Sequence, residues 1–294
     1  MISLIAITYN SRELLPRFLA ALATTAWADY ELIVVDNASS DGTAAWLAAE
    51  HPDVRVIASS ANLGFGAACN LGFGAARGDL LVCMNPDVEV TPDWLAVLHD
   101  HMLANPTAAI ICPSTLYPGD PPPAASGVAP TAAVPGCALM LRRGAWQEIG
   151  GFDEAMFLYW EDTELCWRAG LLGWQVLEDL DAIVYHERGG STRGGRWEAE
   201  AAKNGLYAHL KLRRWGAVAR FAARLVAKTA LRLLRGQPAL LGAWRWNIGR
   251  LPATLRARRQ LLRRGRGDRR RLEALIEAHT RRGRRERRVH RVRA

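Results

Sequence analysis

The sequence predicts an open α/β fold built on a parallel sheet. Short apolar runs alternate with segments of helical periodicity along the N-terminal half of the chain, and such alternation is typical of this fold class. The first two runs, Ser3–Thr8 and Leu32–Asp36, are separated by Arg12–Thr25, in which leucines recur at helical spacing. A strand, helix, strand unit of this kind requires a parallel pair of strands. A chain of 294 residues that is 50% hydrophobic can bury one large domain and an appendage.

The alternation continues along the chain. Further strands and helices are expected at Thr43–Glu50 (helix), Val54–Ala58 (strand), Ala67–Ala76 (helix), Leu80–Met84 (strand), Gly136–Leu141 (strand), Arg143–Ile149 (helix), Trp174–Leu177 (strand) and Ala182–Tyr185 (strand). Another helix is expected to begin near Glu161. The uncharged stretch Pro121–Leu141 is long enough to span a membrane, but its prolines exclude a regular helix. We therefore interpret it as a loop that leads into a buried strand.

Charge distribution and cysteine content limit the classes of protein to which the chain can belong. Residues 1–202 hold 10 Lys and Arg against 25 Asp and Glu, net −15, whereas residues 203–294 hold 28 against 4, net +24. The chain is thus an acidic body with a basic tail. The five cysteines form no C-x-x-C pair, which argues against a disulfide framework or a thiolate zinc site and suits a reducing cytosol. The N-terminus has no basic leader and is interpreted as the first strand.

Polar residues follow the expected strands where ligands of open α/β sheets bind. They are Thr8-Tyr9-Asn10, Asp36-Asn37-Ala38-Ser39 and Asn85-Pro86-Asp87. Asp36 alone is equally well explained as a turn cap. Asp87, held by a stiff proline turn, is a suitable ligand for Mg²⁺ or Mn²⁺. The loop Asn62–Gly66 precedes an Ala- and Gly-rich helix, where glycines allow close backbone approach and a helix N-terminus attracts phosphate, but the loop lacks the P-loop pattern.

A cluster of acids and aromatic rings precedes and begins the helix near Glu161. Phe157, Tyr159 and Trp160 come just before Glu161 and Asp162. Bulky rings around a carboxylate raise its pKa by desolvation, as a general base requires. The alternative, that acids here only favour the helix dipole, fits Glu164 best. His186 ends an expected strand and enters a Gly-rich loop, so it is either a metal or phosphate ligand or a structural histidine.

Together these segments resemble the family 2 glycosyltransferases of the GT-A fold, most closely the rhamnosyltransferase-like branch. The resemblance covers about residues 1–215, and its motifs are Thr8–Asn10, Asp36–Gly42, Asn62–Gly66, Asn85–Asp87, Gly151–Glu154 and Tyr159–Arg168. It implies a Rossmann-like, mixed but mainly parallel sheet flanked by helices, with the basic helical extension, residues 216–294, as a separate region.

The family's residue roles transfer by position. By similarity, the donor-binding residues would be Thr8, Tyr9, Asn10, Asp36, Asn62, Gly64 and Asn85, with Asp36 bonding the nucleotide base. Asp162 matches the catalytic base, with Glu161 beside it. Asp87 matches the last acid of the family's metal-binding D-x-D motif, and His186 resembles a histidine that completes the metal shell. Asn85 stands where many relatives have the first acid, so the site for Mg²⁺ or Mn²⁺ has one fewer charge.

The resemblance implies an inverting transfer of a sugar from a nucleotide donor to a cell-envelope polysaccharide or a polyprenyl-diphosphate-linked glycan. The favoured donor is dTDP-rhamnose, and another donor such as UDP-galactofuranose is the alternative. A protein that binds nucleotide sugars without turnover, or serves as a scaffold, is the competing class. The intact pair of Glu161 and Asp162 argues against it.

The basic tail suggests a membrane surface. Arg220, Arg224, Lys228 and Arg232 recur every four residues and form one stripe of an otherwise apolar helix, which suits an anionic bilayer. The alternative is a helix packed on the catalytic domain with a solvated basic face. Arg281–Arg293 is expected to be exposed, with disorder left open. Nucleic-acid binding is disfavoured because the body is acidic. We therefore expect a cytoplasmic protein that is peripheral at the inner face of the cell membrane.

Overall fold

The computed structural model describes residues 1–186 and 195–293, apart from the side chains of 195, 196 and 284–293. Within this part of the chain, nine strands form one sheet in the order β3-β2-β1-β4-β8-β6-β9-β5, and β7 pairs with β9. The strands are β1 (Ile2–Thr8), β2 (Tyr30–Asp36), β3 (Arg55–Ala58), β4 (Leu80–Met84), β5 (Val88–Val90), β6 (Ala108–Leu116), β7 (Val128–Pro130), β8 (Ala138–Arg142) and β9 (Gln175–His186).

The sheet is mixed, as the family resemblance predicts. Strands β1 to β4 are mutually parallel neighbours, with β1 between β2 and β4. Strand β8 runs antiparallel to both β4 and β6, whereas β6 and β9 are parallel. The N-terminal end of β8 therefore lies beside the carboxyl ends of β4 and β1. This arrangement brings the segment before β8 to the edge of the sheet where ligands are expected.

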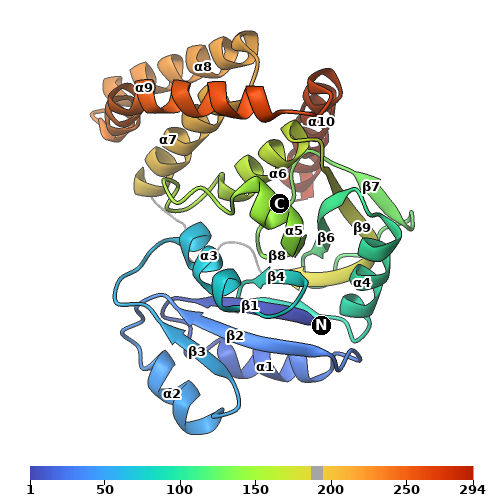
Figure 1. The fold of residues 1–294 in the computed structure, drawn as a ribbon. Coiled ribbons are helices and arrows are strands. Elements are labelled where there is room, and N and C mark those ends of the chain that lie inside the picture. Colours follow the sequence, from blue (N-terminus) through green and yellow to red (C-terminus); the bar gives the residue numbers. More distant parts are fainter. Residues whose placement is uncertain (187–194, 294) are drawn as a thin grey trace.

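Helices cover both faces of the sheet and bury one apolar cluster on each (Figure 1). Along β1, Leu4 belongs to one cluster and Ile5 to the other, because successive strand side chains point to opposite faces. Three helices contribute to the first cluster: α1 (Leu15–Ala23), α2 (Thr43–Glu50) and α4 (Trp94–Ala104). Three others contribute to the second: α3 (Phe65–Ala75), α5 (Arg143–Ile149) and α6 (Glu161–Leu171).

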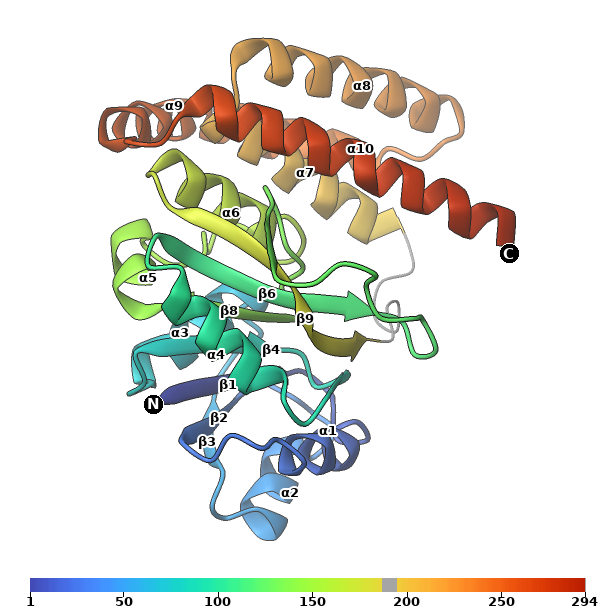
Figure 2. The same ribbon diagram turned by 90° about the vertical axis from the view of Figure 1, so that its right-hand side faces the viewer.

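The C-terminal helices form a further layer that packs on α6, on the side away from the sheet (Figures 1 and 2). They are α7 (Gly195–Leu212), α8 (Trp215–Leu234), α9 (Ala239–Arg264) and α10 (Arg269–Arg293). A shared apolar cluster joins Trp167 of α6 to Tyr207 of α7, Leu261 of α9 and Ile276 of α10. These helices are thus attached to α6 by a common core. Helix α10 continues to Arg293, in the segment for which the sequence left disorder open.

Buried charges reinforce the contact between α6 and α7. Arg168 donates to the fully buried Glu164, its neighbour one turn earlier. Lys211 of α7 donates to both Glu164 and Asp153, at 2.7 and 2.6 Å. Burial raises the pKa of Glu164, but Arg168 and Lys211 outweigh it and hold that pKa below its usual value. Each buried charge is therefore compensated by an opposite one, as burial requires.

Two features of the sheet differ from the sequence-based expectation. Trp174–Leu177 and Ala182–Tyr185, expected as two strands, correspond to a single strand, β9. Between these two segments the register of β9 with β6 shifts, at Pro113 and Ser114 of β6. The bulge leaves residues 180–182 of β9 without partners on β6.

The sequence analysis also assigned no element between Asp87 and Pro121, where β5, α4 and β6 lie. Strand β6 is buried over most of its length, so it lacks polar alternation.

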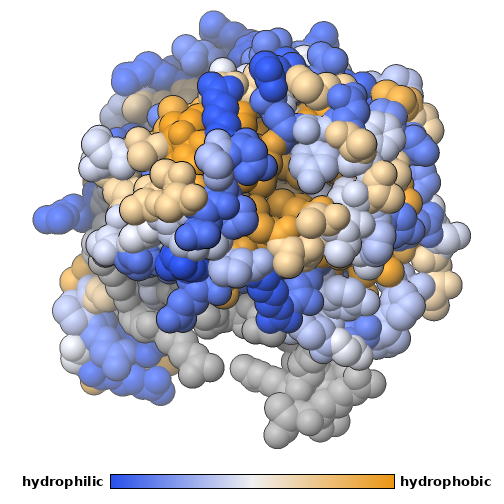
Figure 3. Space-filling model, turned by 90° about the horizontal axis from the view of Figure 1, so that it is seen from below, coloured by the Kyte–Doolittle hydropathy of each residue, from blue (hydrophilic) through white to orange (hydrophobic). Residues whose placement is uncertain are grey.

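Hydrophilic and hydrophobic side chains are intermixed on the face of the molecule around α1 and α2 (Figure 3). Figure 3 shows apolar side chains gathered near the middle of this face and bordered by polar and charged ones. Apolar atoms make up roughly 55–60% of an ordinary protein surface, so this pattern is typical of a face in contact with water.

Two glycines of α3 provide a matched test of how closely this helix packs on the sheet. A Cβ at Gly72 would lie 2.4 Å from Ile5 and 3.0 Å from Val35, whereas one at Gly74 meets nothing within 4 Å. We expect Gly72→Ala to lower the free energy of unfolding by about 1–3 kcal/mol through overpacking. Gly74→Ala should raise it by about 0.5–1 kcal/mol, the usual gain in a helix. Urea denaturation measures both, and equal effects would show that α3 does not pack as described.

Candidate active site

Thr8 and Asp36 lie side by side at the carboxyl ends of β1 and β2. They are register partners, and the Thr8 hydroxyl lies 3.3 Å from Asp36 Oδ1. The Ser39 hydroxyl also donates to Oδ1, and the Ser39 amide donates to Oδ2. Asp36 is only 3% exposed. Its carboxylate is therefore held in one orientation at the sheet edge, as recognition of a ligand requires.

The loops after β1 and β2 are tied to each other through Asn10. Its amide donates to the Ser39 hydroxyl at 2.9 Å, and its side-chain oxygen accepts the Ser40 amide at 2.8 Å. Asn10 and Ala38 both have positive φ, 51° and 63°, an uncommon conformation that costs energy and often marks functional loops. Tyr9 remains 52% exposed. Asn10 thus positions the loops, whereas the Tyr9 ring is open to a ligand.

Asn62 and Gly64 shape the start of α3. The Asn62 side-chain oxygen accepts from Asn37 and from the Gly64 amide, both at 3.0 Å. Gly64 has φ +82°, and a Cβ there would lie 2.2 Å from the carbonyl oxygen of Phe157. Only glycine fits this contact. The loop therefore brings the N-terminus of α3 against the segment that precedes Glu161.

The residues just before Glu161 form a strained turn held from α7. Tyr159 and Trp160 have φ of 69° and 75°. Asn204, which is fully buried on α7, donates to the carbonyl oxygens of Leu158 and Tyr159 at 3.0 and 2.9 Å. These bonds stabilise a conformation that aromatic residues rarely adopt. Sequence analysis missed Asn204, for which the only signal is a polar residue among the apolar positions of a helix.

Glu161 and Asp162, at the start of α6, have different environments. Asp162 accepts the amide and hydroxyl of Thr163 with one oxygen and the Gly136 amide, at 3.1 Å, with the other. Glu161 is buried, and its Oε2 atom has no hydrogen-bond partner among the described residues. Burial and the neighbouring Asp162 charge raise the pKa of Glu161 to about 8. Burial also raises the pKa of Asp162, but its three hydrogen bonds oppose that shift. At neutral pH, Glu161 therefore carries a proton, whereas Asp162 receives hydrogen bonds that stabilise its charged form.

The start of β8 connects Asp162 to the Asn85–Asp87 turn. Gly136 donates to Asp162, and the carbonyl of the next residue, Cys137, accepts from the Asn85 amide at 2.9 Å. Two residues beyond Asn85, Asp87 Oδ1 lies 3.1 Å from His186 Nε2. The other ring nitrogen of His186, Nδ1, is buried and has no hydrogen-bond partner within the described part of the chain. The structure thus pairs Asp87 with His186 and links their turn to Asp162 through the start of β8.

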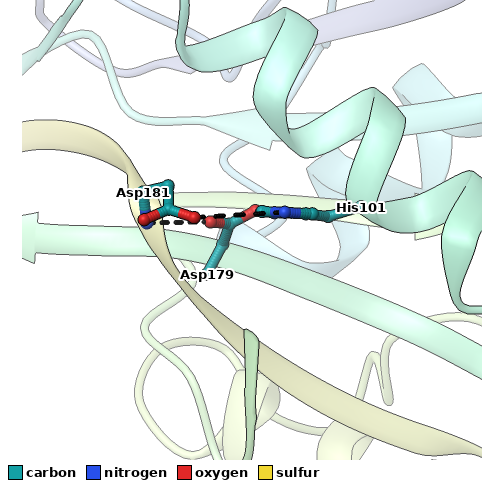
Figure 4. Close-up of side chains that lie close together, drawn as sticks. All are labelled: His101, Asp179 and Asp181. Carbon is teal, nitrogen blue, oxygen red and sulfur yellow. Dashed lines mark hydrogen bonds and ion pairs between the residues drawn. The ribbon is translucent and has the colours of Figure 1, made fainter. Parts of the chain in front are cut away.

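A second group of possible ligands lies elsewhere on β9. His101, Asp179 and Asp181 place one ligand atom each within 4.8 Å of one another (Figure 4). Asp179 precedes His186 by seven residues on the same strand, which corresponds to roughly 20 Å. Its other oxygen accepts the amides of Asp181 and Ala182. This group, which the sequence analysis did not single out, fastens the β9 bulge to α4 and lies away from Asp87.

Sequence comparison identifies the family. The profile described as glycosyl transferase family 2 matches residues 3–162, more than half of the chain and a range that includes Asp36, Asp87 and Asp162. The chain belongs to glycosyl transferase family 2. It is therefore a glycosyltransferase, as the sequence analysis predicted, and the rhamnosyltransferase-like resemblance is supported by the relatives described next.

One relative of this glycosyltransferase is N-acetylglucosaminyl-diphospho-decaprenol L-rhamnosyltransferase of Mycobacterium tuberculosis, 28% identical over 65% of this chain and 78% of the relative. Another is the low-salt glycan biosynthesis hexosyltransferase Agl10 of Haloferax volcanii, which is 26% identical over 57% of this chain and 61% of the relative. Residues 1–349 of Staphylococcus aureus TarS superpose with a TM-score of 0.60, at 16% identity over 95% and 91% of the two chains. The mannosyltransferase PcManGT of Pyrobaculum calidifontis, in complex with GDP-Man and Mn²⁺, superposes with a TM-score of 0.56. It is 20% identical and the match covers 89% of this chain and 86% of that one. These neighbours confirm the GT-A fold.

The buried carboxyl of Glu161 predicts a measurable pH dependence of stability. Its pKa is about 8 in the fold against an ordinary value of 4.5, so the folded chain holds a proton that the unfolded chain loses between these pH values. Wild-type stability should therefore fall as pH rises through this window, and Glu161→Gln should remove that loss. Urea unfolding at pH 5 and pH 8 should show a gain for Glu161→Gln that grows by on the order of 1–3 kcal/mol toward pH 8.

The control for this experiment is Glu50→Gln, at an exposed position of α2. It should follow the wild-type curve at both pH values. Parallel curves for wild type and Glu161→Gln would show that Glu161 is ionised in the fold.

Proposed function

We propose that this family 2 glycosyltransferase performs an inverting transfer of a sugar from a nucleotide donor to a polyprenyl-diphosphate-linked glycan or cell-envelope polysaccharide precursor. The observation that carries the proposal is the Asp162 carboxylate, oriented by three hydrogen bonds beside the neutral Glu161. The preferred donor is dTDP-rhamnose, because the Mycobacterium relative is named as an L-rhamnosyltransferase acting on a diphospho-decaprenol acceptor. UDP-galactofuranose is the alternative donor within the same reaction class.

Asp162 acts as the general base in this proposal. An acceptor hydroxyl attacks the anomeric carbon from the face opposite the nucleotide diphosphate, so a single displacement inverts the anomeric centre. Asp162 takes the hydroxyl proton as the new bond forms, and its raised pKa brings it closer to that task than an ordinary aspartate. Glu161, being neutral, adds no second negative charge beside the base.

The donor would lie along the carboxyl edge of β1, β2 and β4. Asp36, fixed by Thr8 and Ser39, would bond the nucleotide base, and the half-exposed Tyr9 ring would line the same pocket. Asn10, Asn62 and Gly64 hold the surrounding loops. Asn85, joined to the start of β8, would face the diphosphate side.

The residues near Asp87 fit a divalent cation. Asp87 offers the oxygen that pairs with His186 Nε2, and His186 offers a second ring nitrogen, Nδ1, that is buried without a hydrogen-bond partner among the described residues. Both atom types bind such ions. Asn85 supplies an amide in place of a second carboxylate. We propose that Asp87 and His186 would hold Mg²⁺ or Mn²⁺, consistent with the Mn²⁺ present with PcManGT. The ion would neutralise charge on the departing diphosphate.

Substitution of the base tests the enzymatic proposal. Asp162→Asn should lower the rate of sugar transfer by roughly 10²-fold or more while nucleotide-sugar binding is nearly kept, because only proton transfer is lost. Glu161→Gln, which copies the neutral form, should lose much less. A panel of nucleotide sugars, assayed with Mn²⁺ or Mg²⁺ and again with EDTA, gives the rates. Wild-type turnover by Asp162→Asn would exclude Asp162 as the base, and donor binding without turnover in the wild type would favour a non-catalytic binding protein.

We also propose that the outer surface of α8 and α9 rests on an anionic membrane. Val226 and Leu234 of α8 and Ile248 of α9 are 55%, 86% and 66% exposed, and α8 also carries the exposed cations Arg220 and Arg224. Exposed apolar side chains beside cations suit the interface of an anionic bilayer.

Two observations limit the form that this membrane contact takes. The expected basic stripe is only partly available to lipid, because Lys228 and Arg232 pair with Glu198 of α7. None of the helices in the described part of the chain combines the length and hydropathy of a membrane-spanning segment. The contact would therefore depend on the exposed apolar side chains together with Arg220 and Arg224.

Liposome flotation tests this surface. Wild-type protein should float with vesicles that contain anionic lipid and much less with neutral vesicles, because both apolar insertion and charge contribute. The double variant Leu234→Ser, Ile248→Ser should float less. Leu103→Ser is the matched control, since Leu103 is 57% exposed but lies on α4. Protein that stays in the soluble fraction with anionic vesicles, while nucleic acid shifts it in a gel, would reverse the proposal.

A further inference from the structure

A cavity of about 880 Å³ lies beside Asp162, between β6, the segment before β8, β9 and α10. Asp162 and Thr163 form part of its wall, whereas none of the residues expected to bind the nucleotide sugar lines it. If Asp162 is the base, as proposed above, one side of it faces the donor and the other the acceptor. The cavity then belongs to the acceptor side.

The outer wall of this cavity comes from the C-terminal helix α10. Arg282 of α10 donates to both carboxylate oxygens of Glu178 on β9, at 2.6 and 3.2 Å. The two side chains are 59% and 21% exposed, so an incoming ligand can reach them. An Arg and a carboxylate in this paired arrangement present a planar set of donors and acceptors.

We propose that the cavity holds the acceptor saccharide, and that Glu178 and Arg282 are specificity-determining residues that hydrogen-bond its hydroxyl groups. Sugar hydroxyls donate and accept, so one ring can satisfy a carboxylate and a guanidinium together. Tyr117, Pro121 and Pro135 add flat apolar surface to the lining, against which the C–H face of a sugar can pack. This assignment rests on the proposed function for the identity of the ligand as acceptor.

The charges of the lining favour an uncharged sugar ring over an anionic group. Asp120, Asp162 and Glu178 line the cavity with carboxylates, against the single guanidinium of Arg282 and the imidazole of His279. Like charges repel, so an anionic group in this cavity would be disfavoured by the excess of carboxylates. A diphosphate on the acceptor would therefore remain outside the cavity, and the saccharide would enter it.

Helix α10 is firmly attached at this position, so its side chains can form a defined wall. Leu272 and Ile276 are buried against Trp167 and Leu171 of α6. A Cβ at Gly170 would lie 2.8 Å from Leu272, which shows how closely the two helices approach. Helix α6, which carries the proposed base, therefore also holds α10, which forms the outer wall of the cavity.

The test compares acceptor and donor kinetics in Arg282→Ala, Glu178→Gln and the double variant, with a soluble alkyl glycoside of N-acetylglucosamine as acceptor probe. Each single variant should raise the KM for the glycoside by about 10-fold or more, while the KM for the nucleotide sugar changes by less than about twofold, because charge-assisted hydrogen bonds to the acceptor alone are lost. The double variant should raise the KM for the glycoside little more than either single variant does, since the pair acts as a unit.

Arg281→Ala is the matched control. Arg281 is an exposed neighbour on α10 that is not among the lining residues, so its KM values should match the wild type.

Calorimetric binding of the same glycoside separates failure of this inference from failure of the proposed function. Binding by the wild type that Arg282→Ala weakens supports the cavity even if no nucleotide sugar is turned over. Turnover with an unchanged glycoside KM in Arg282→Ala overturns the inference and leaves the function intact. Equal increases in the KM for donor and acceptor, with a lowered melting temperature, would show that Arg282 only fastens α10, and would also overturn it.

Discussion

The buried ion pairs between α6 and α7 are the interaction on which the rest of the site depends. Glu164 is fully buried and is neutralised from two directions, by Arg168 of its own helix and by Lys211 of α7. Removing either cation would leave an unpaired charge in the core, which costs several kcal/mol, about 3–5 by analogy with other buried pairs. Because Asp162 lies half a turn before Glu164 on the same helix, its position depends on the same contacts. Helix α7 therefore supports the segment that carries the base proposed above.

This dependence explains why the strained turn before α6 persists. Tyr159 and Trp160 adopt positive φ at a cost of order 1–3 kcal/mol each. The bonds from Asn204 and the packing of Trp160 against Phe221 offset that cost. Asn204 lies on α7 and Phe221 on α8, so the geometry of Glu161 and Asp162 depends on residues beyond the matched family segment, which ends at Asp162. The expected boundary near residue 215 falls between α7 and α8, two helices that bury apolar side chains in one cluster.

The sequence predicted those features that depend on local pattern. Alternating strands and helices gave the parallel half of the sheet, and the strand-end rule placed Thr8 beside Asp36. It did not predict contacts that depend on register or distant packing. The β9 bulge arises from pairing with β6, a strand whose buried faces leave no alternation to detect. Asn204, Glu178 and Arg282 act through partners at least 45 residues away, and no local motif encodes such pairs.

Two competing effects act on the acids at the start of α6, and their magnitudes decide the roles. A helix N-terminus favours a carboxylate by typically 0.3–1 kcal/mol, which alone would keep Glu161 and Asp162 ionised. Burial opposes this more strongly, because each unit of pKa shift corresponds to about 1.4 kcal/mol and the pKa of Glu161 rises to about 8. Hydrogen bonds from Thr163 and Gly136 oppose the rise in the pKa of Asp162, whereas Glu161 Oε2 receives no donor from the described residues. The hydrogen bonds that each carboxylate receives, rather than the helix dipole, therefore account for the difference between the two acids.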